Sequence, residues 1–176
     1  MSFFQRDRKT LLYLLAIGSP IAFSVWQTLL NNFVIDVVQF TGREIGFLQS
    51  IREVPGFLAF TVVWVLLIVR QQTFAIISLI LLGLGTAATG FFPSVMGLYI
   101  TTVLMSIGFH YLETMQSSLS LQWLAKNETA KVLGKIISIR SMATLAVLGG
   151  LYIGLQIFEP NYLWIYAAGG LTTVGI

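Results

Sequence analysis

The chain has 176 residues, of which 56% are hydrophobic and 10% charged, with ten Lys and Arg against seven Asp and Glu. Its mean hydropathy of +0.86 excludes an ordinary soluble protein, because apolar stretches of about 20 residues recur and only a bilayer hides that many. The net charge of +3 does not indicate a nucleic-acid partner, since the basic residues lie in short connections and form no groove-lining patch. The chain contains no cysteine, which excludes disulfides and thiolate chemistry.

Turn-forming residues and charges divide the chain into six apolar segments, each of which we expect to be a transmembrane helix. The first apolar run is too long for a cleaved signal peptide. Continuous runs of this length also exclude a β-barrel, whose strands alternate polar and apolar residues over ~9–11 positions. The predicted spans are 11–38, 44–69, 74–92, 96–123, 131–157 and 162–176.

Lys and Arg are distributed unevenly between the two sides of these spans. If the N-terminus is cytoplasmic, only Arg43 falls on the outer side, and Arg52 and Arg140 fall within spans. This excess predicts a multi-pass protein of the cell (inner or plasma) membrane with a cytoplasmic N-terminus. The residues on the predicted cytoplasmic side are Arg6, Arg8, Lys9, Arg70, Lys126, Lys131 and Lys135.

The pattern G-x-x-x-S-I-R occurs twice, ending at Arg52 in the second span and at Arg140 in the fifth. These helices enter the membrane from opposite sides, so the pattern predicts two inverted three-helix repeats, about 1–92 and 93–176, with chance agreement as the alternative. We therefore predict an all-α integral membrane domain over 1–176. Its last segment has about 15 of the ~20 residues needed to cross, so we expect the chain to end within helix 6 of a twelve-helix protein.

Polar side chains share one face of the first predicted helix and one face of the fourth. Lipid cannot satisfy such groups, so both faces should look inward. The stripes are Ser24, Gln27 and Asn31 on the first helix and Ser106, His110, Glu113 and Ser117 on the fourth. For the serines we favour hydrogen bonds between helices. The predicted lining of a substrate cavity is Gln27, Asn31, His110 and Glu113.

Charged side chains inside apolar runs are the strongest functional candidates, because a charge at bilayer depth costs at least ~2.5 kcal/mol. Glu113 and Arg140 both lie about ten residues, or roughly 15 Å, from the cytoplasmic ends of adjacent helices and are predicted to pair. We expect this pair to carry proton coupling, with a static structural pair as the alternative. Nearer the outer side, Arg52 is expected to face Asp36, and the sequence names no partner for Glu53.

Other patterns are weaker. His110 and Glu113 form H-x-x-E on one helix face, but no third ligand is apparent, so no metal or cofactor is predicted. The sequence contains no P-loop and no Ser/His/Asp triad. Close helix packing within the bundle is predicted at Gly83, Gly85, Gly90, Gly150 and Gly154.

These features make the chain resemble the N-terminal six-helix half of a major facilitator superfamily (MFS) transporter. The cues are the inside N-terminus, the short hairpins, the stretch from Gly42 to Leu48 leading into helix 2, the charged loop after helix 4 and the Gly-rich helix 5. The resemblance implies that helices 1 and 4 line a central cavity. It also implies that an acidic residue on helix 4 works with an arginine on helix 5, places that Glu113 and Arg140 match.

The chain departs from the family in two motifs. Between helices 2 and 3 the family has G-x-x-x-D-R-x-G-R-R, whereas the stretch from Val65 to Gln72 keeps only one basic residue, Arg70. Helix 5 has glycines but lacks the Gly-Pro of the antiporter motif, so drug–proton antiport is less supported.

The expected function is transport of a small polar or anionic solute by alternating access, either proton-coupled (as symport or antiport) or facilitative, and not catalysis. Arg52, Arg140 and His110 would attract an anion, and Glu113 would carry a coupling proton. The expected partners are the solute, protons or another coupling ion, the bilayer and a C-terminal six-helix half, with no nucleic acid. The alternatives are a membrane-embedded enzyme or metal-binding protein using His110 and Glu113, and a non-transporting scaffold with fully packed polar faces.

Overall fold

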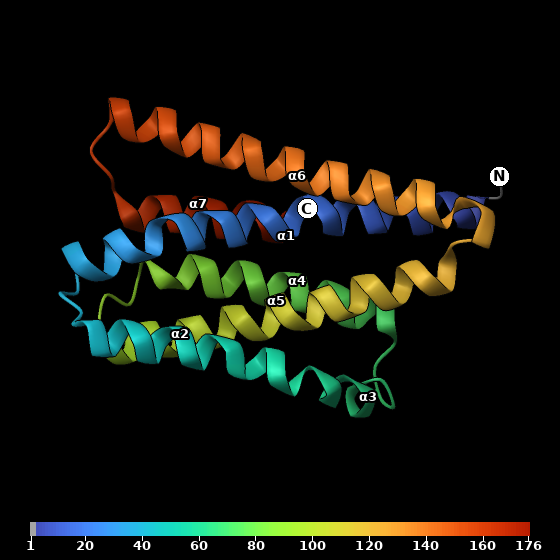
Figure 1. The fold of residues 1–176 in the computed structure, drawn as a ribbon, viewed down its shortest axis with the longest axis horizontal. Helices are drawn as coiled ribbons and strands as arrows, with labels where there is room; N and C mark the ends of the chain where they lie inside the picture. Colours follow the sequence, from blue (N-terminus) through green and yellow to red (C-terminus); the bar gives the residue numbers. More distant parts are fainter. Residues whose placement is uncertain (1–2) are drawn as a thin grey trace.

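A computed structural model describes residues 3–176, with side chains from residue 8 onward. Arg6, counted above among the basic residues, lies outside the described side chains. The all-α prediction is confirmed over the described residues, and Figure 1 shows the long helices running side by side. In chain order they are α1 (Phe3–Asp36), α2 (Gly42–Phe57), the 3-10 turn η1 (Leu58–Thr61), α3 (Val62–Val65), α4 (Gln71–Thr89), α5 (Val95–Trp123), α6 (Lys126–Ile157) and α7 (Tyr162–Val174).

Within the described part of the chain, four helices are long and apolar enough to cross a membrane, which is compatible with a membrane-embedded protein. α7 has only 13 residues, and the segment predicted as the second span is divided into shorter pieces. α1 and α6 begin earlier than predicted, because charged residues extend their first turns beyond the apolar runs. The four candidate spans are Arg8–Asp36, Gln71–Thr89, Val95–Trp123 and Lys126–Ile157.

The prediction of one continuous helix over 44–69 is wrong. α2 ends at Phe57, two residues after Pro55, and the chain continues through η1 and the short α3 to Val65. Proline lacks a backbone N–H and its ring collides with the preceding turn, which weakens the helix at this point. The hydrogen bonds then tighten to the 3-10 pattern. Pro20 in α1 is accommodated in an unbroken helix, so proline alone does not decide the outcome.

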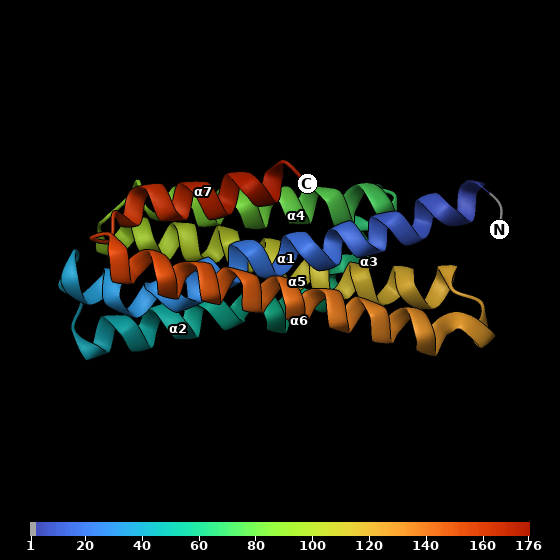
Figure 2. The same cartoon turned by 90° about the horizontal axis from the view of Figure 1, so that it is seen from above.

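The helices form three layers, which Figure 2 shows edge-on. α4 and α7 lie together on one side, α1 and α5 occupy the middle, and α2 and α6 lie on the other side. α1 packs against α6 and α7, whereas α5 packs against α2 and α4. The core therefore surrounds the middle layer, and its fully buried side chains include Leu12, Trp26, Leu82, Met105 and Leu112.

α2 and α6 are the least buried of the long helices. α6 buries only Val132 and Ile136, and α2 buries only Leu48 and Pro55. The other apolar side chains of these two helices are exposed or only partly buried. Exposed apolar surface of this extent is typical of a face that meets lipid or another protein surface.

Glycines allow α4 and α5 to approach closely. A Cβ added to Gly85 would lie 2.6 Å from the Cα of Met105, and one added to Gly108 would lie 2.7 Å from the carbonyl oxygen of Ser78. Small residues at such crossings let two helix backbones come into contact. The contact is made by backbone atoms, which cannot rotate away as a side chain can.

The predicted close packing at glycines holds for α4 but not for α6. Added Cβ atoms at Gly83 and Gly90 would meet α7 at distances of 2.7 and 2.8 Å, respectively. By contrast, Cβ atoms at Gly150 and Gly154 would meet nothing within 4 Å, so the G-x-x-x-G prediction for this helix is wrong. The physical reason is that both glycines line a pocket between α6 and α7, where the two backbones do not touch.

We expect Gly108→Ala to destabilise the bundle, because the new methyl group collides with the backbone of α4. Overpacking of this kind costs typically ~1–3 kcal/mol. The measurement is the thermal unfolding midpoint of the purified protein in detergent. Gly150→Ala is the matched control and should leave the midpoint unchanged or raise it, since Ala favours a helix. Equal destabilisation by both substitutions would contradict this account of the packing.

Candidate functional site

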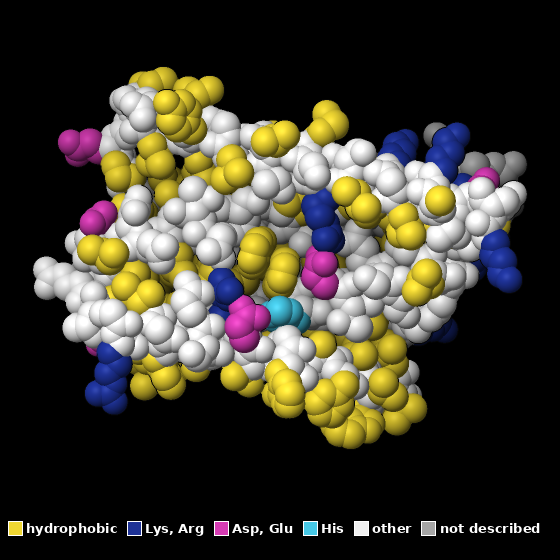
Figure 3. Space-filling model, viewed as in Figure 1, with side chains coloured by type: hydrophobic (Ala, Val, Ile, Leu, Met, Phe, Trp, Pro, Cys, Tyr) yellow, Lys and Arg dark blue, Asp and Glu magenta, His cyan; other side chains and the backbone are white. Residues whose placement is uncertain are grey.

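A pocket of about 380 Å³ lies between α1, α5 and α6. The contributing residues recur every three to four positions on each helix, so each helix presents one face to the pocket. Figure 3 shows that this side of the molecule is hollowed and that charged side chains and the histidine gather near its middle. The lining residues are Ser19, Pro20, Phe23, Ser24, Gln27, Thr28, Phe109, Glu113, Arg140, Thr144 and Leu148.

Glu113 of α5 and Arg140 of α6 form an ion pair in this pocket, as their spacing predicts. Arg140 Nη1 donates to Glu113 Oε2 at 3.0 Å, and Arg140 Nη2 donates to Glu113 Oε1 at 2.6 Å. Two parallel hydrogen bonds of this kind are the strongest arrangement of a guanidinium with a carboxylate. The two side chains are 35% and 34% exposed, so the pair is open to the pocket.

Gln116 supports this pair, and sequence reasoning missed it. Its Oε1 accepts a second hydrogen bond from Arg140 Nη2 at 2.8 Å, while its Nε2 donates to the backbone carbonyl of Leu12 at 3.3 Å. Gln116 is buried and therefore holds the guanidinium in one orientation. Its position three residues after Glu113, on the same helix face, is the signal that could have identified it.

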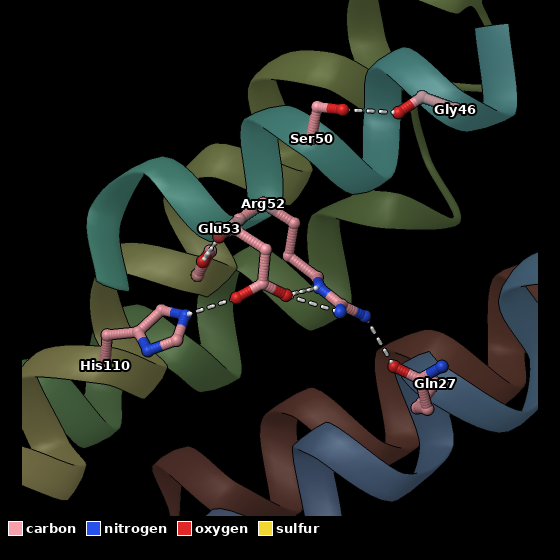
Figure 4. Close-up of polar contacts among 7 residues, drawn as sticks. Gln27, Gly46, Ser50, Arg52, Glu53 and His110 are labelled. Carbon is pink, nitrogen blue, oxygen red and sulfur yellow. Dashed lines mark hydrogen bonds and ion pairs between the residues drawn. The ribbon is translucent and has the colours of Figure 1, made fainter. Parts of the chain in front are cut away.

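A second charged cluster joins α2, α1 and α5 (Figure 4). Arg52 donates to Oε1 of its neighbour Glu53 from Nε at 3.0 Å and from Nη2 at 2.5 Å. Arg52 Nη1 also donates to Gln27 Oε1 at 2.9 Å. His110 Nε2 lies 3.9 Å from Glu53 Oε2, an ion pair when the imidazole is protonated. This outer cluster comprises Gln27, Arg52, Glu53 and His110.

The backbone of α2 lies directly against α5 at this cluster. The hydroxyl of Ser106 donates to the carbonyl oxygen of Arg52, which is the interhelical hydrogen bond expected of a serine on this stripe. A Cβ added to Gly56 would lie 2.7 Å from Cε1 of His110. The imidazole therefore fits against α2 only because residue 56 has no side chain.

The predicted contact between Arg52 and Asp36 is wrong. Asp36 instead accepts a hydrogen bond from the Tyr162 hydroxyl at 3.0 Å. Nine residues of α1, or ~14 Å, separate Asp36 from Gln27, the residue level with Arg52. The partner of Glu53 is its own neighbour, since a long arginine side chain can bend back although adjacent Cβ atoms point about 100° apart.

Only two of the four residues predicted to line a cavity lie in this pocket. Gln27 and Glu113 line the pocket, and Gln27 also binds Arg52, so it links the pocket to the outer cluster. His110 belongs to the outer cluster, and Asn31 is exposed and does not line this pocket.

Sequence reasoning also missed an aromatic pair formed by α1 and α5. Phe23 and Phe109 stack with ring centroids 4.2 Å apart and line the pocket. They lie four residues before Gln27 and Glu113 respectively, on the same helix faces. An aromatic residue one turn from a polar stripe is the signal that could have indicated them.

The two copies of G-x-x-x-S-I-R have the same local hydrogen bond. The hydroxyl of Ser50 donates to the carbonyl of Gly46 at 2.8 Å, and that of Ser138 donates to the carbonyl of Gly134 at 2.9 Å. Serine forms such bonds within many helices, so this agreement concerns local conformation and not the arrangement of the repeats.

The described residues contain no group of three or more His, Cys, Asp or Glu side chains placed to hold a metal ion. His110 directs Nε2 toward Glu53, although the H-x-x-E pattern would pair it with Glu113. The chemistry that this arrangement supports is the exchange of hydrogen bonds and protons among paired charges.

We expect Arg140→Met to destabilise the protein, because it leaves the Glu113 carboxylate without its cation. Breaking a fully buried pair costs ~3–5 kcal/mol, and the partial exposure of this pair lowers the expected loss to about 1–3 kcal/mol. The double variant Glu113→Gln/Arg140→Met should recover most of the loss in the thermal unfolding midpoint. Additive losses in the double variant would show that the two side chains do not interact.

Comparisons with protein-family models, with curated proteins and with solved structures find no match to this chain. A helical fold hosts many activities, so the geometry of the site is what indicates the function.

Proposed function

We propose that the chain is the N-terminal half of an MFS-like secondary transporter that moves a small polar or anionic solute by alternating access, coupled to protons. The observation that carries this proposal is the placement of two ion pairs from three helices: Glu113–Arg140 lines the pocket, and Arg52–Glu53 is joined to it through Gln27. Charges at this depth are costly, and they are retained where they line a solute or ion pathway.

Glu113 is the proposed site of the coupling proton. A deprotonated carboxylate accepts both hydrogen bonds from Arg140, whereas a protonated one loses its charge and holds the guanidinium weakly. Protonation of Glu113 therefore frees Arg140, which Gln116 keeps in place, to bind an anionic group of the solute. Release of the solute restores the pair and expels the proton.

Arg52 is the proposed second contact for the solute. It is held by Gln27 and Glu53, and its hydrogen bond to the neutral amide of Gln27 can be exchanged for one to a ligand while Glu53 stays paired. Gln27 lies between Arg52 and the pocket. A ligand that displaces the Gln27 side chain from Arg52 could therefore contact Arg140 first and Arg52 afterwards.

The proposed alternating access uses the outer layer of the molecule. α2 packs mainly on α5, α6 packs mainly on α1, and both bury few side chains. Elements with few buried contacts move at the lowest cost. In an inverted repeat, α2 and α6 would be counterparts and would open opposite sides of the pocket.

The proposed surroundings follow from the charge distribution. A cytoplasmic N-terminus in the cell membrane agrees with the excess of Lys and Arg in the connections on one side of the spans. A C-terminal six-helix half would cover the hollowed side on which α2 and α6 lie, completing the cavity.

Transport by the complete protein in liposomes tests the role of Glu113. The probes are small mono- and dicarboxylates, inorganic phosphate and amino acids, with a pH-sensitive dye inside the vesicles. We expect an acidic exterior to drive uptake of at least one probe together with acidification of the interior. Glu113→Gln should abolish this pH-driven uptake and leave exchange of the same solute intact.

Glu159→Gln is the matched control, because Glu159 is exposed in the connection between α6 and α7. It should leave both activities unchanged. Unaltered pH-driven uptake in Glu113→Gln would contradict the proposed proton site, and failure of every probe to enter would contradict transport of small polar or anionic solutes.

A further inference from the structure

A second pocket, of about 490 Å³, lies at the end of the bundle where α1 begins and α5 passes into α6. Figure 1 shows α6 starting alongside the N-terminal part of α1. Lys9 and Tyr13 line the pocket from α1, four residues apart, and Lys131 and Lys135 line it from α6, also four residues apart. Two helix faces with the same spacing therefore converge on one space.

The described side chains of this pocket carry excess positive charge. Glu128 pairs with Lys9 at 2.6 Å and so neutralises one of the three lysines. Lys131 and Lys135 are exposed, and the ammonium of Lys135 lies 4.7 Å from the centre of the Tyr13 ring. Two positive charges and a phenolic hydroxyl are thus available to an anion, and Lys9 is already held in place.

The position of the pocket favours a ligand that enters laterally, between α1 and α6. It opens between two neighbouring helices and is separate from the central pocket. Farther along α6, on the same helix face as Lys131 and Lys135, the apolar side chain of Met142 is 70% exposed. A phosphate at the lysines would therefore have its attached acyl chains beside apolar surface.

The neighbouring residues mark the depth expected for lipid headgroups. The guanidinium of Arg8 lies 5.6 Å from the centre of the Trp123 ring, next to the start of α6. Tryptophan and basic residues are enriched at the membrane–water interface. Basic pockets between transmembrane helices on the cytoplasmic side are suited to phosphate headgroups, because anionic lipids concentrate in that leaflet.

We propose that this pocket binds the headgroup of an anionic phospholipid, with Lys131 and Lys135 holding the phosphate and with the acyl chains lying along α1 and α6. The inference rests on the proposed function only for the embedding of the chain in a membrane. It does not depend on Glu113 or on the solute, so the two proposals can fail separately.

Native mass spectrometry of the complete protein in a neutral detergent tests this site. The probes are phosphatidylglycerol, phosphatidylcholine and soluble glycerol 3-phosphate. We expect phosphatidylglycerol to bind about tenfold more tightly than phosphatidylcholine, since two lysines interact with its net charge. Lys131→Gln/Lys135→Gln should remove this preference, and glycerol 3-phosphate should not displace the lipid.

The matched control is Arg70→Gln/Lys126→Gln, which removes two exposed positive charges that do not line the pocket. It should keep the preference for phosphatidylglycerol. Equal loss in both double variants would overturn the proposal in favour of diffuse surface attraction. Displacement of the lipid by glycerol 3-phosphate would identify a site for soluble phosphates, and equal binding of the two lipids would exclude a site for anionic headgroups.

Discussion

The close contact between α4 and α5 determines which side of α5 is left for chemistry. Gly85 and Gly108 bring the two backbones together, so this face of α5 is fully occupied. Glu113 lies roughly 140° around the helix from Gly108, and His110 lies farther round, so both point away from α4. α1 completes the middle layer beside α5, and the pocket forms where the polar faces of these two helices meet α6. The α4–α5 contact thus creates the tightly packed apolar side of the bundle and leaves the polar face of α5 on the other side.

Charge pairing is the second constraint on the site. Each arginine of the two clusters pairs with a carboxylate: Arg140 with Glu113, and Arg52 with Glu53. Neutral amides extend both pairs, because Gln116 binds Arg140 and Gln27 binds Arg52. Each guanidinium is therefore held by both a carboxylate and a neutral amide. The Phe23–Phe109 stack stands at the same pocket and supplies an apolar surface beside these charges.

The break after α2 is placed next to the outer cluster. Pro55 and Gly56 precede the 3-10 turn, and Gly56 is the residue against which the imidazole of His110 rests. The helix is weakened at this point, so a local change in its backbone would also shift His110 and Glu53. α2 also buries few side chains, so Arg52 and Glu53 lie on a weakly packed helix of the site.

The sequence by itself determined the all-helical class with long apolar helices, the polar faces of α1 and α5 and the pairing of Glu113 with Arg140. These follow from periodicity and from depth counted along neighbouring antiparallel helices, which are properties of the chain taken one helix at a time. Only the tertiary structure decided that Arg52 binds Gln27 instead of Asp36 and that the glycines of α6 meet no neighbour. Those outcomes depend on side-chain conformation and on the distance between two helix axes. The spacing of residues along the sequence determines neither quantity.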